Sequence, residues 1–304
     1  MHTRRNFLKS TAVLVAAPLI YNQSFAHSRF ALPAPGVQLF TFFNTIDNDV
    51  PGTLKQIADA GYKNIESAFS KKGGFYGMKP KEFAAMLSGL GLSWKSHHVI
   101  GAPFKMPANA KPILDANGKP ITIPPMKNLR DNMQELVDAV AEGGAEYIVC
   151  ATSPMGTGQE ISDSIGVLNK SAEAAKKAGL KFAYHNHDAE FKTVEGKIPY
   201  ERLLSDTDAS LVKLELDVAW SVKGGANPVE LFSKHPGRFP LWHVKDLDAK
   251  RETILPLGEG TIDYVPVFKA ASTAGLEYFF IEHDMPKDPF ESIRKSMAAL
   301  KKFS

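Results

Sequence analysis

Polar residues that bind metals or move protons recur at the ends of short apolar runs in the second half of the chain. Residues two apart share one face of a strand, so each run offers an imidazole or a carboxylate to the same side. Four successive runs of this kind supply a mixed nitrogen and oxygen shell for one divalent ion, of a type that suits Mn, Zn, Co, Fe or Mg rather than Ca. The predicted metal ligands are His185, Asp217, His243 and Glu282, with His187 as the alternate ligand on its strand.

Titratable residues beside these predicted ligands are suited to moving a proton. A divalent ion next to carboxylates and imidazoles suits proton removal from a carbon next to a carbonyl or hydroxyl group, because the ion polarises the oxygen and stabilises the enediolate. The predicted bases are Glu282, His187 and Glu190, and Lys245 is placed to hold an oxyanion. A structural salt bridge to Asp246 or Glu215 is the alternative role for Lys245.

Substrate contacts are predicted at three further positions. Glu66 lies near the end of the second apolar run. Trp220, three residues after Asp217, is placed either to stack on the apolar face of a sugar ring or to pack in the core. His97 and His98 lie on opposite faces of the third run. We expect His98 to contact the substrate, because it stands nearer the end of the strand.

Eight short apolar or β-branched runs alternate with helical patterns, which is typical of βα units around a parallel sheet. An Ala-Gly pair recurs at 60–61, 178–179 and 274–275, where glycine should end a helix just before a strand. No Gly-x-Gly-x-x-Gly turn follows an early strand, which disfavours an open doubly wound sheet. The prediction is an α/β fold, a single (β/α)₈ TIM barrel. Its expected strands are 36–40, 64–67, 93–98, 146–151, 181–185, 212–217, 241–245 and 278–282, and its expected helices include 80–90, 126–142, 164–178, 264–274 and 289–302.

The segment 103–125 should be a long excursion from the barrel. It carries six prolines, a single glycine and no helical period, and it directly follows the third strand. In a barrel this position lies on the C-terminal face, where active sites form. The segment is either a decorated surface loop or a lid over the substrate.

The N-terminal residues are expected to be an export signal. Arg4 and Arg5 precede an apolar run at 11–20 and a small-residue site at 24–26, a pattern that resembles the twin-arginine signal. Cleavage after Ala26 should release a mature domain, 27–304, into the periplasm. The apolar run, at roughly ten residues, is too short to span a bilayer, so no membrane anchor is expected in the mature form. Cys150 is the single cysteine, so no internal disulfide can form.

Composition and charge suit a globular enzyme and not a nucleic-acid binder. The 304 residues are 44% hydrophobic and 23% charged, with a net charge of +3. Much of the positive excess lies at the two ends of the chain rather than in a clustered basic face. The expected partner is a small molecule, and the sequence leaves a homo-oligomer open.

Five ordered motifs together resemble the sugar phosphate isomerase/epimerase family of xylose-isomerase-like barrels. They are YHNH at 184–187, ELDVAW at 215–220, HVKD at 243–246, GEGTIDY at 258–264 and IEHD at 281–284. The resemblance covers essentially the whole chain after Ala26 and implies a divalent ion held by His185, Asp217, His243 and Glu282. His185 departs from the family pattern, because the ketose epimerases have a glutamate there that is both ligand and proton-transfer group.

The resemblance implies a periplasmic, metal-dependent sugar isomerase or epimerase that abstracts a proton next to a carbonyl group. A lyase or hydrolase of 3-keto-glycosides on the same metal site is the first alternative, and a non-catalytic sugar-binding protein is the second. Apurinic endonucleases share the barrel, but they hold three zinc ions with further histidines. This chain has Trp220 at one of those positions and lacks an Asp-x-His before Gly258. The expected ligand is therefore a sugar or a glycoside.

Overall fold

The structure is a computed structural model that describes residues 32–103 and 126–303. The expected signal peptide, 1–26, and nearly all of the predicted excursion at 103–125 lie outside the described residues. Within the described ranges, no helix combines the length and the apolar content needed to cross a membrane.

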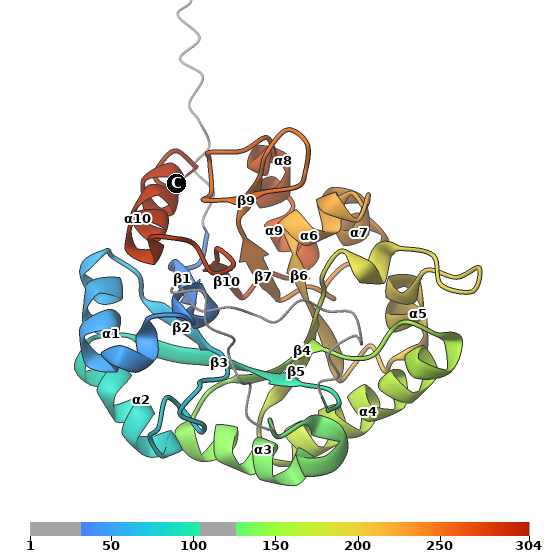
Figure 1. Ribbon diagram of the computed structural model, residues 1–304. Helices are drawn as coiled ribbons and strands as arrows, with labels where there is room; N and C mark the ends of the chain where they lie inside the picture. Colours follow the sequence, from blue (N-terminus) through green and yellow to red (C-terminus); the bar gives the residue numbers. More distant parts are fainter. Residues whose placement is uncertain (1–31, 104–125, 304) are drawn as a thin grey trace, which may run out of the picture.

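Eight parallel strands among the described residues close into a barrel (Figure 1). The barrel closes between the first and last strands, where Gly36 pairs with Phe280 and Val37 with Ile281. The predicted (β/α)₈ fold is confirmed, and the predicted strand boundaries differ from the observed ones by at most two residues. The barrel strands are β1 (Gly36–Gln38), β2 (Asn64–Ser67), β3 (Ser93–Ile100), β4 (Tyr147–Thr152), β5 (Lys181–His185), β6 (Val212–Asp217), β7 (Leu241–Val244) and β10 (Tyr278–Ile281).

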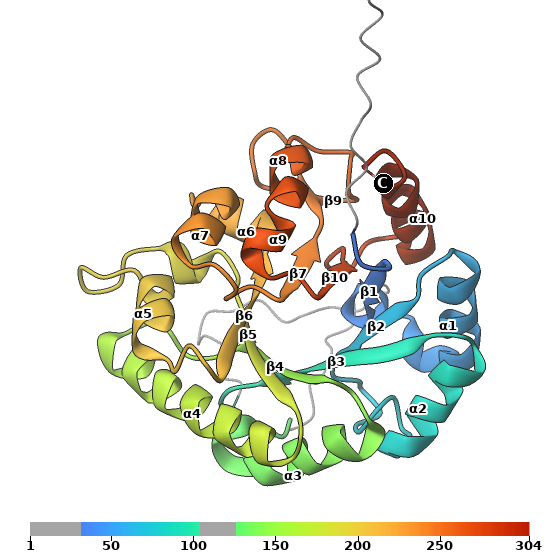
Figure 2. The same cartoon turned by 180° about the vertical axis from the view of Figure 1, so that it is seen from behind.

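Helices form a ring around the barrel, as both views show (Figures 1 and 2). They are α1 (Val50–Asp59), α2 (Pro80–Gly89), α3 (Leu129–Gly143), α4 (Gly158–Lys177), α5 (Pro199–Asp206), α6 (Val218–Lys223), α7 (Pro228–Lys234), α8 (Tyr264–Lys269), α9 (Ala271–Ala274) and α10 (Pro289–Leu300). The sequence placed the start of α4 six residues too late, because the Thr157 side chain caps the helix by accepting the backbone N–H of Glu160. The helix expected at 264–274 is interrupted at Ala270, between α8 and α9.

Short elements and glycine joints complete the connections. The first strand ends at Gln38 instead of Phe40, because Leu39–Phe42 forms a 3₁₀ helix whose Phe40 N–H donates to the Gln38 side chain. A small antiparallel pair that the sequence did not predict, β8 (Asp246–Leu247) and β9 (Ile254–Leu255), follows β7. At the predicted joint before β10, Gly275 takes a left-handed φ of 79°, which favours glycine.

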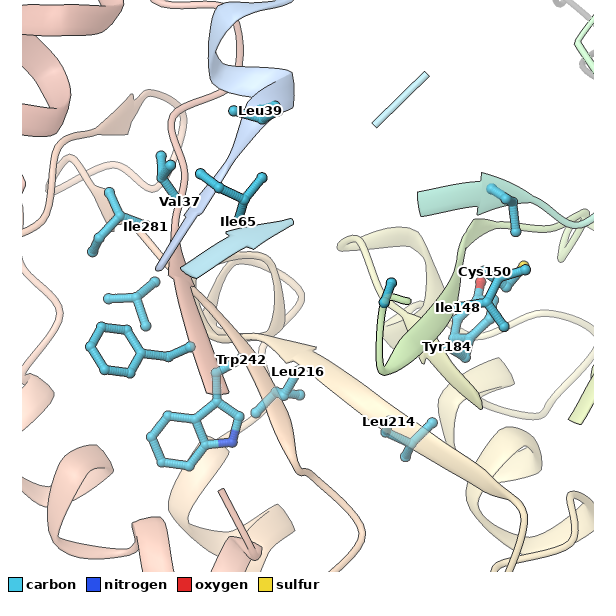
Figure 3. Close-up of a cluster of buried hydrophobic side chains, with 14 of the residues drawn as sticks. Val37, Leu39, Ile65, Ile148, Cys150, Tyr184, Leu214, Leu216, Trp242 and Ile281 are labelled. Carbon is cyan, nitrogen blue, oxygen red and sulfur yellow. The ribbon is translucent and has the colours of Figure 1, made fainter. Parts of the chain in front are cut away.

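The main core lies between the barrel and its helices (Figure 3). Leu214 and Leu216 of β6 point into this core, and Trp242 of β7 stacks on Phe232 of α7 with ring centroids 4.7 Å apart. Because strand residues alternate between faces, the side chains next to Leu214 and Leu216 point into the barrel. The same packing that buries the apolar face therefore presents polar strand ends to the barrel interior.

Candidate active site

Titratable residues from five strands point into the barrel. Each comes from the C-terminal part of its strand, and each is at most 6% exposed. In this fold the C-terminal ends of the strands form the functional face. The residues are Glu66 of β2, His98 of β3, His185 of β5, Glu215 of β6 and His243 of β7.

His97 and His98 occupy opposite faces of β3. The His97 ring packs outward, with its centroid 4.8 Å from that of Phe75 and 6.2 Å from that of Trp94. Its Nδ1 lies 2.7 Å from Ser67 Oγ, and burial lowers the pKa of His97 to about 3, so the ring is neutral. His98 faces the barrel interior, which is the side that we expected for a site residue.

A compact network joins two buried carboxylates to three imidazoles. Glu66 Oε1 lies 2.5 Å from His243 Nε2 and 3.1 Å from His98 Nε2. Glu215 Oε2 lies 2.7 Å from His98 Nε2 and 3.3 Å from His243 Nε2. His185 Nδ1 joins the network 3.1 Å from the same Glu215 oxygen. His98 and His243 therefore each bridge the two carboxylates.

Burial and mutual charge set the protonation of this network. Burial raises the pKa of Glu66, but His98 and His243 outweigh it and hold that pKa well below its ordinary value. Burial, together with the charge of Glu66, raises the pKa of Glu215 to about 7. Burial opposes a charge on His98, yet the two carboxylates raise its pKa to about 9. The pKa of His185 falls well below its ordinary value because the ring is buried among other imidazoles.

A buried lysine organises the carboxylates at the ends of β6 and β10. Lys245 Nζ lies 2.8 Å from Asp217 Oδ2 and 2.8 Å from Asp284 Oδ2, and it donates a hydrogen bond to Glu282 Oε2. Burial lowers the pKa of Lys245, but these three carboxylates raise it well above its ordinary value, so the ammonium is charged. His243 Nδ1 lies 3.0 Å from Glu282 Oε2 and connects this cluster to the deeper network.

Two groups of buried donors have the spacing of metal ligands, and within each group the donor atoms lie within 4.8 Å of one another. The first contains His98, His185, Glu215 and His243, and the second contains Asp217, His243 and Glu282. The four ligands predicted from sequence divide between these groups, with His243 in both. Their assignment as one shell stays a prediction.

The first donor group fits a cation on its own chemistry. Glu215 Oε1 is buried and accepts no hydrogen bond from any residue that the structure describes. A buried carboxylate oxygen without a donor is costly, and a cation beside it would remove that cost. Three imidazoles and one carboxylate are a ligand set that zinc and other transition metals accept.

A cavity of about 200 Å³ opens above these residues. Four of the residues predicted for the site line it, together with Asp284. The polar lining is His98, His185, His187, Glu282 and Asp284, and the remaining lining is mostly apolar: Phe40, Phe43, Ala68, Phe69, Ile100, Met126, Ala151, Thr152 and Met285. The buried residues Glu66, Asp217, His243 and Lys245 are absent from the described lining, so the substrate contact predicted for Glu66 stays a prediction.

Glu190 and Trp220 stand behind His187 rather than in the cavity wall. Glu190 is buried, accepts the backbone N–H of His187 at 3.0 Å and accepts the Tyr184 hydroxyl at 2.7 Å. The Trp220 ring centroid lies 5.8 Å from that of His187, and Lys245 Nζ lies 5.3 Å from the Trp220 ring. Both residues therefore hold their neighbours in place, and neither is among the described residues that line the cavity.

Sequence reasoning missed three contributors to the site. It placed Glu215 on the face of Asp217 but gave it no role, although their two-residue spacing was the available signal. It left Asp284 without a role, although this residue ends the IEHD motif and binds Lys245. Asp246 accepts the backbone N–H groups of Gly258 and Ile262, both at 3.0 Å, and so fixes the Gly-Glu-Gly turn.

Residues 54–303 match the sequence profile of the xylose isomerase-like TIM barrel family. Curated relatives include the inosose dehydratases of Clostridium beijerinckii, 30% identical over 155 residues (44% of this chain and 51% of the relative), and of Geobacillus thermodenitrificans, 28% identical over 177 residues (51% and 58%). The chain spans about half the length of the curated relatives that it matches.

Solved structures resemble the whole barrel. A sugar phosphate isomerase/epimerase from Parabacteroides distasonis is 26% identical with a TM-score of 0.73, covering 89% of this chain and 98% of that one. The IOLI protein, solved with a bound zinc atom, is 15% identical with a TM-score of 0.65, covering 89% of this chain and 98% of that one, and shows likeness of fold alone.

Proposed function

The chain belongs to the xylose isomerase-like TIM barrel family, and from this membership we propose that it is an enzyme that removes a proton next to the carbonyl group of a sugar-like polyhydroxy ketone. The observation that carries the proposal is the cavity in which the imidazole of His187 stands beside a buried set of metal-ligand side chains. The proposed outcome is loss of water, in the manner of a dehydratase, which the likeness to inosose dehydratases supports.

The proposed metal ligands are His98, His185, Glu215 and His243. Glu215 Oε1 and Asp217 Oδ2 are both buried without a hydrogen-bond donor among the described residues. Asp217 Oδ2, however, lies 2.8 Å from the Lys245 ammonium, which also pairs with Glu282, so the second donor group already has a counter-charge. An ammonium and a divalent ion at the same two carboxylates would repel each other. When bound, the divalent ion supplies Lewis-acid polarisation of the substrate's carbonyl oxygen.

His187 is the proposed proton-transfer residue. Its ring lines the cavity, and no described side chain donates a hydrogen bond to it or accepts one from it. The contact between its backbone N–H and Glu190 holds the residue in place without engaging either ring nitrogen. Glu282, the base predicted from sequence, also lines the cavity, but its carboxylate is engaged by Lys245 and His243. We therefore assign the proton transfer to His187 and a positioning role to Glu282.

The proposed reaction balances without a further reactant. The imidazole of His187 takes the proton from the carbon next to the carbonyl, and the electron pair of that bond forms a carbon–carbon double bond. The bond from the next carbon to its leaving oxygen then breaks; this oxygen is a hydroxyl group in inosose and the aglycone oxygen in a 3-keto-glucoside. The same imidazole returns the proton to that oxygen, so that water or the aglycone alcohol leaves. Because the deprotonated carbon carries a hydroxyl group, the product is an enol, and it becomes a ketone by taking a solvent proton on the carbon that lost the leaving group.

The test incubates inosose and a 3-keto-glucoside, separately, with metal-loaded enzyme in deuterated water and measures the mass and the deuterium content of the products. Wild-type enzyme should convert inosose to a product that is lighter by one water and carries deuterium on carbon. From the 3-keto-glucoside, whose β carbon carries the aglycone oxygen and no hydroxyl group, it should release the aglycone as an alcohol. His187→Gln should slow both changes by on the order of 10²-fold or more, the usual scale for losing a general base. Its metal content should match that of the wild type, because His187 lies outside the proposed ligand set. Full activity in His187→Gln, or turnover that leaves carbon free of deuterium, would refute the mechanism.

Epimerisation is the second candidate, supported by the likeness to the Parabacteroides sugar phosphate isomerase/epimerase. The first proton transfer would be the same, but a solvent proton would return to the carbon next to the carbonyl. The same experiment separates the two outcomes. Epimerisation would give a product with an unchanged oxygen count and deuterium at that carbon.

A further inference from the structure

One side of the cavity is an apolar wall made of Phe40, Phe43, Phe69 and Met285. The two residues Phe40 and Phe43 follow β1, Phe69 follows β2 and Met285 follows β10. These three strands are neighbours in the barrel (Figure 1). The three phenyl rings pack on one another with centroids 5.2, 5.6 and 6.0 Å apart. The three phenyl rings therefore form one continuous surface, and Met285 lines the same cavity.

Met285 stands out within this wall. It is 41% exposed, and among the described residues Val265 is the other large apolar side chain that is similarly exposed. Its φ of 46° lies in the left-handed region that favours glycine, so a methionine here is strained. The residue before it, Asp284, is bound to Lys245. Strained, exposed apolar residues that adjoin a fixed site residue are characteristic of ligand contacts.

The imidazoles of the cavity come from other strands, whereas the two carboxylates, Glu282 and Asp284, follow β10 as Met285 does. His98 belongs to β3, and His185 and His187 lie at the end of β5 and just after it. A free sugar carries hydroxyl groups around its whole ring, and those turned toward the wall of phenyl rings would lose water without gaining a partner. A cavity that combines imidazoles from β3 and β5 with phenyl rings that follow β1 and β2 suits a ligand that is polar at one end and apolar at the other.

The geometry points to a substrate in which the keto-sugar carries an aromatic aglycone that packs on Phe40, Phe43, Phe69 and Met285. Phenyl rings attract another ring by edge-to-face packing, and the methionine thioether adapts to an aromatic edge. This inference deepens the proposed function and rests on it for the keto-sugar half of the ligand. It makes the wall a determinant of specificity that takes no part in the proton transfer.

Binding of two matched probes, phenyl and methyl 3-keto-glucoside, to the metal-loaded full chain tests the inference by calorimetric titration. Wild-type protein should bind the phenyl probe on the order of tenfold more tightly. Phe69→Ser and, independently, Met285→Gly should each reduce this preference while leaving the affinity for the methyl probe within about twofold. Val265→Ala removes exposed apolar surface outside the cavity and should preserve the full preference.

Each outcome bears on the inference separately from the reaction. The aromatic assignment would be overturned by any of three outcomes. The wild type could bind both probes equally, it could bind neither, or its preference for the phenyl probe could survive in both wall variants. Preference for the phenyl probe without turnover of either probe would support the wall while contradicting the proposed reaction. Turnover of both probes with equal affinity would retain the reaction and contradict the wall.

Discussion

Lys245→Met should cost far more stability than the loss of an ordinary surface ion pair. The lysine is fully buried and is paired with Asp217, Glu282 and Asp284, of which Asp217 and Glu282 are themselves at most 4% exposed. Methionine retains the apolar stem but removes the ammonium, so two buried carboxylates lose their counter-charge. Removing one partner of a buried ion pair typically costs about 3–5 kcal/mol, and we expect a loss of free energy of unfolding in that range.

The assay is reversible urea unfolding of metal-free protein, compared with Lys55→Met as a matched control. Lys55 forms an exposed ion pair of 2.7 Å with Asp59 one turn away on α1, so its loss should cost only about 0.3–0.5 kcal/mol. A Lys245→Met variant that unfolds within about 1 kcal/mol of the wild type would refute the reasoning, because the carboxylates would then not need the buried charge.

Two further predictions concern other parts of the chain. Replacing Arg4 and Arg5 by lysine should leave the precursor in the cytoplasm, as fractionation would reveal, and unimpaired periplasmic delivery would contradict the proposed export. Glu146→Gln should lower stability by no more than about 1 kcal/mol at pH 7 and by less at pH 3, because this half-buried carboxylate is partly screened by solvent. Burial raises the pKa of Glu146, but the hydrogen bond from Lys95 outweighs burial and lowers that pKa. The contribution of the Glu146 carboxylate to folding stability is therefore present above the pKa that this group has in the unfolded chain, and it is lost as the pH falls. A penalty that grows on acidification would contradict this sign.

The sequence predicted the fold and the inward direction of the main site residues because both depend on local periodicity. Alternation in a strand places Glu215 and Asp217 on one side and Leu214 and Leu216 on the other, and the structure has this arrangement. The β8 and β9 pair escaped prediction because two-residue strands have no period to detect. The break at Ala270 escaped it because a helical period continues through both α8 and α9.

The grouping of donors depended on distances across the barrel, which one sequence does not contain. The order of strands along the chain predicted that His185 would share a metal ion with Asp217. In the structure, His185 Nδ1 instead lies 3.1 Å from Glu215 Oε2. The sequence did not predict the apolar wall either, because Phe43, Phe69 and Met285 lie in connections without a periodic pattern. They line one cavity because β1, β2 and β10 are neighbours in the barrel.

The central claim is that Glu215, and not Asp217, holds the divalent ion together with His98, His185 and His243. The most direct test is metal content per chain, measured by mass spectrometry after dialysis, in wild-type protein and in the isosteric variants Glu215→Gln and Asp217→Asn. Asparagine retains the side-chain oxygen that caps α6 at the Trp220 N–H, so Asp217→Asn is a matched control for folding. We predict that Glu215→Gln falls to background metal while Asp217→Asn retains the wild-type content. Retention in Glu215→Gln with loss in Asp217→Asn would contradict the claim and place the ion at Asp217, His243 and Glu282.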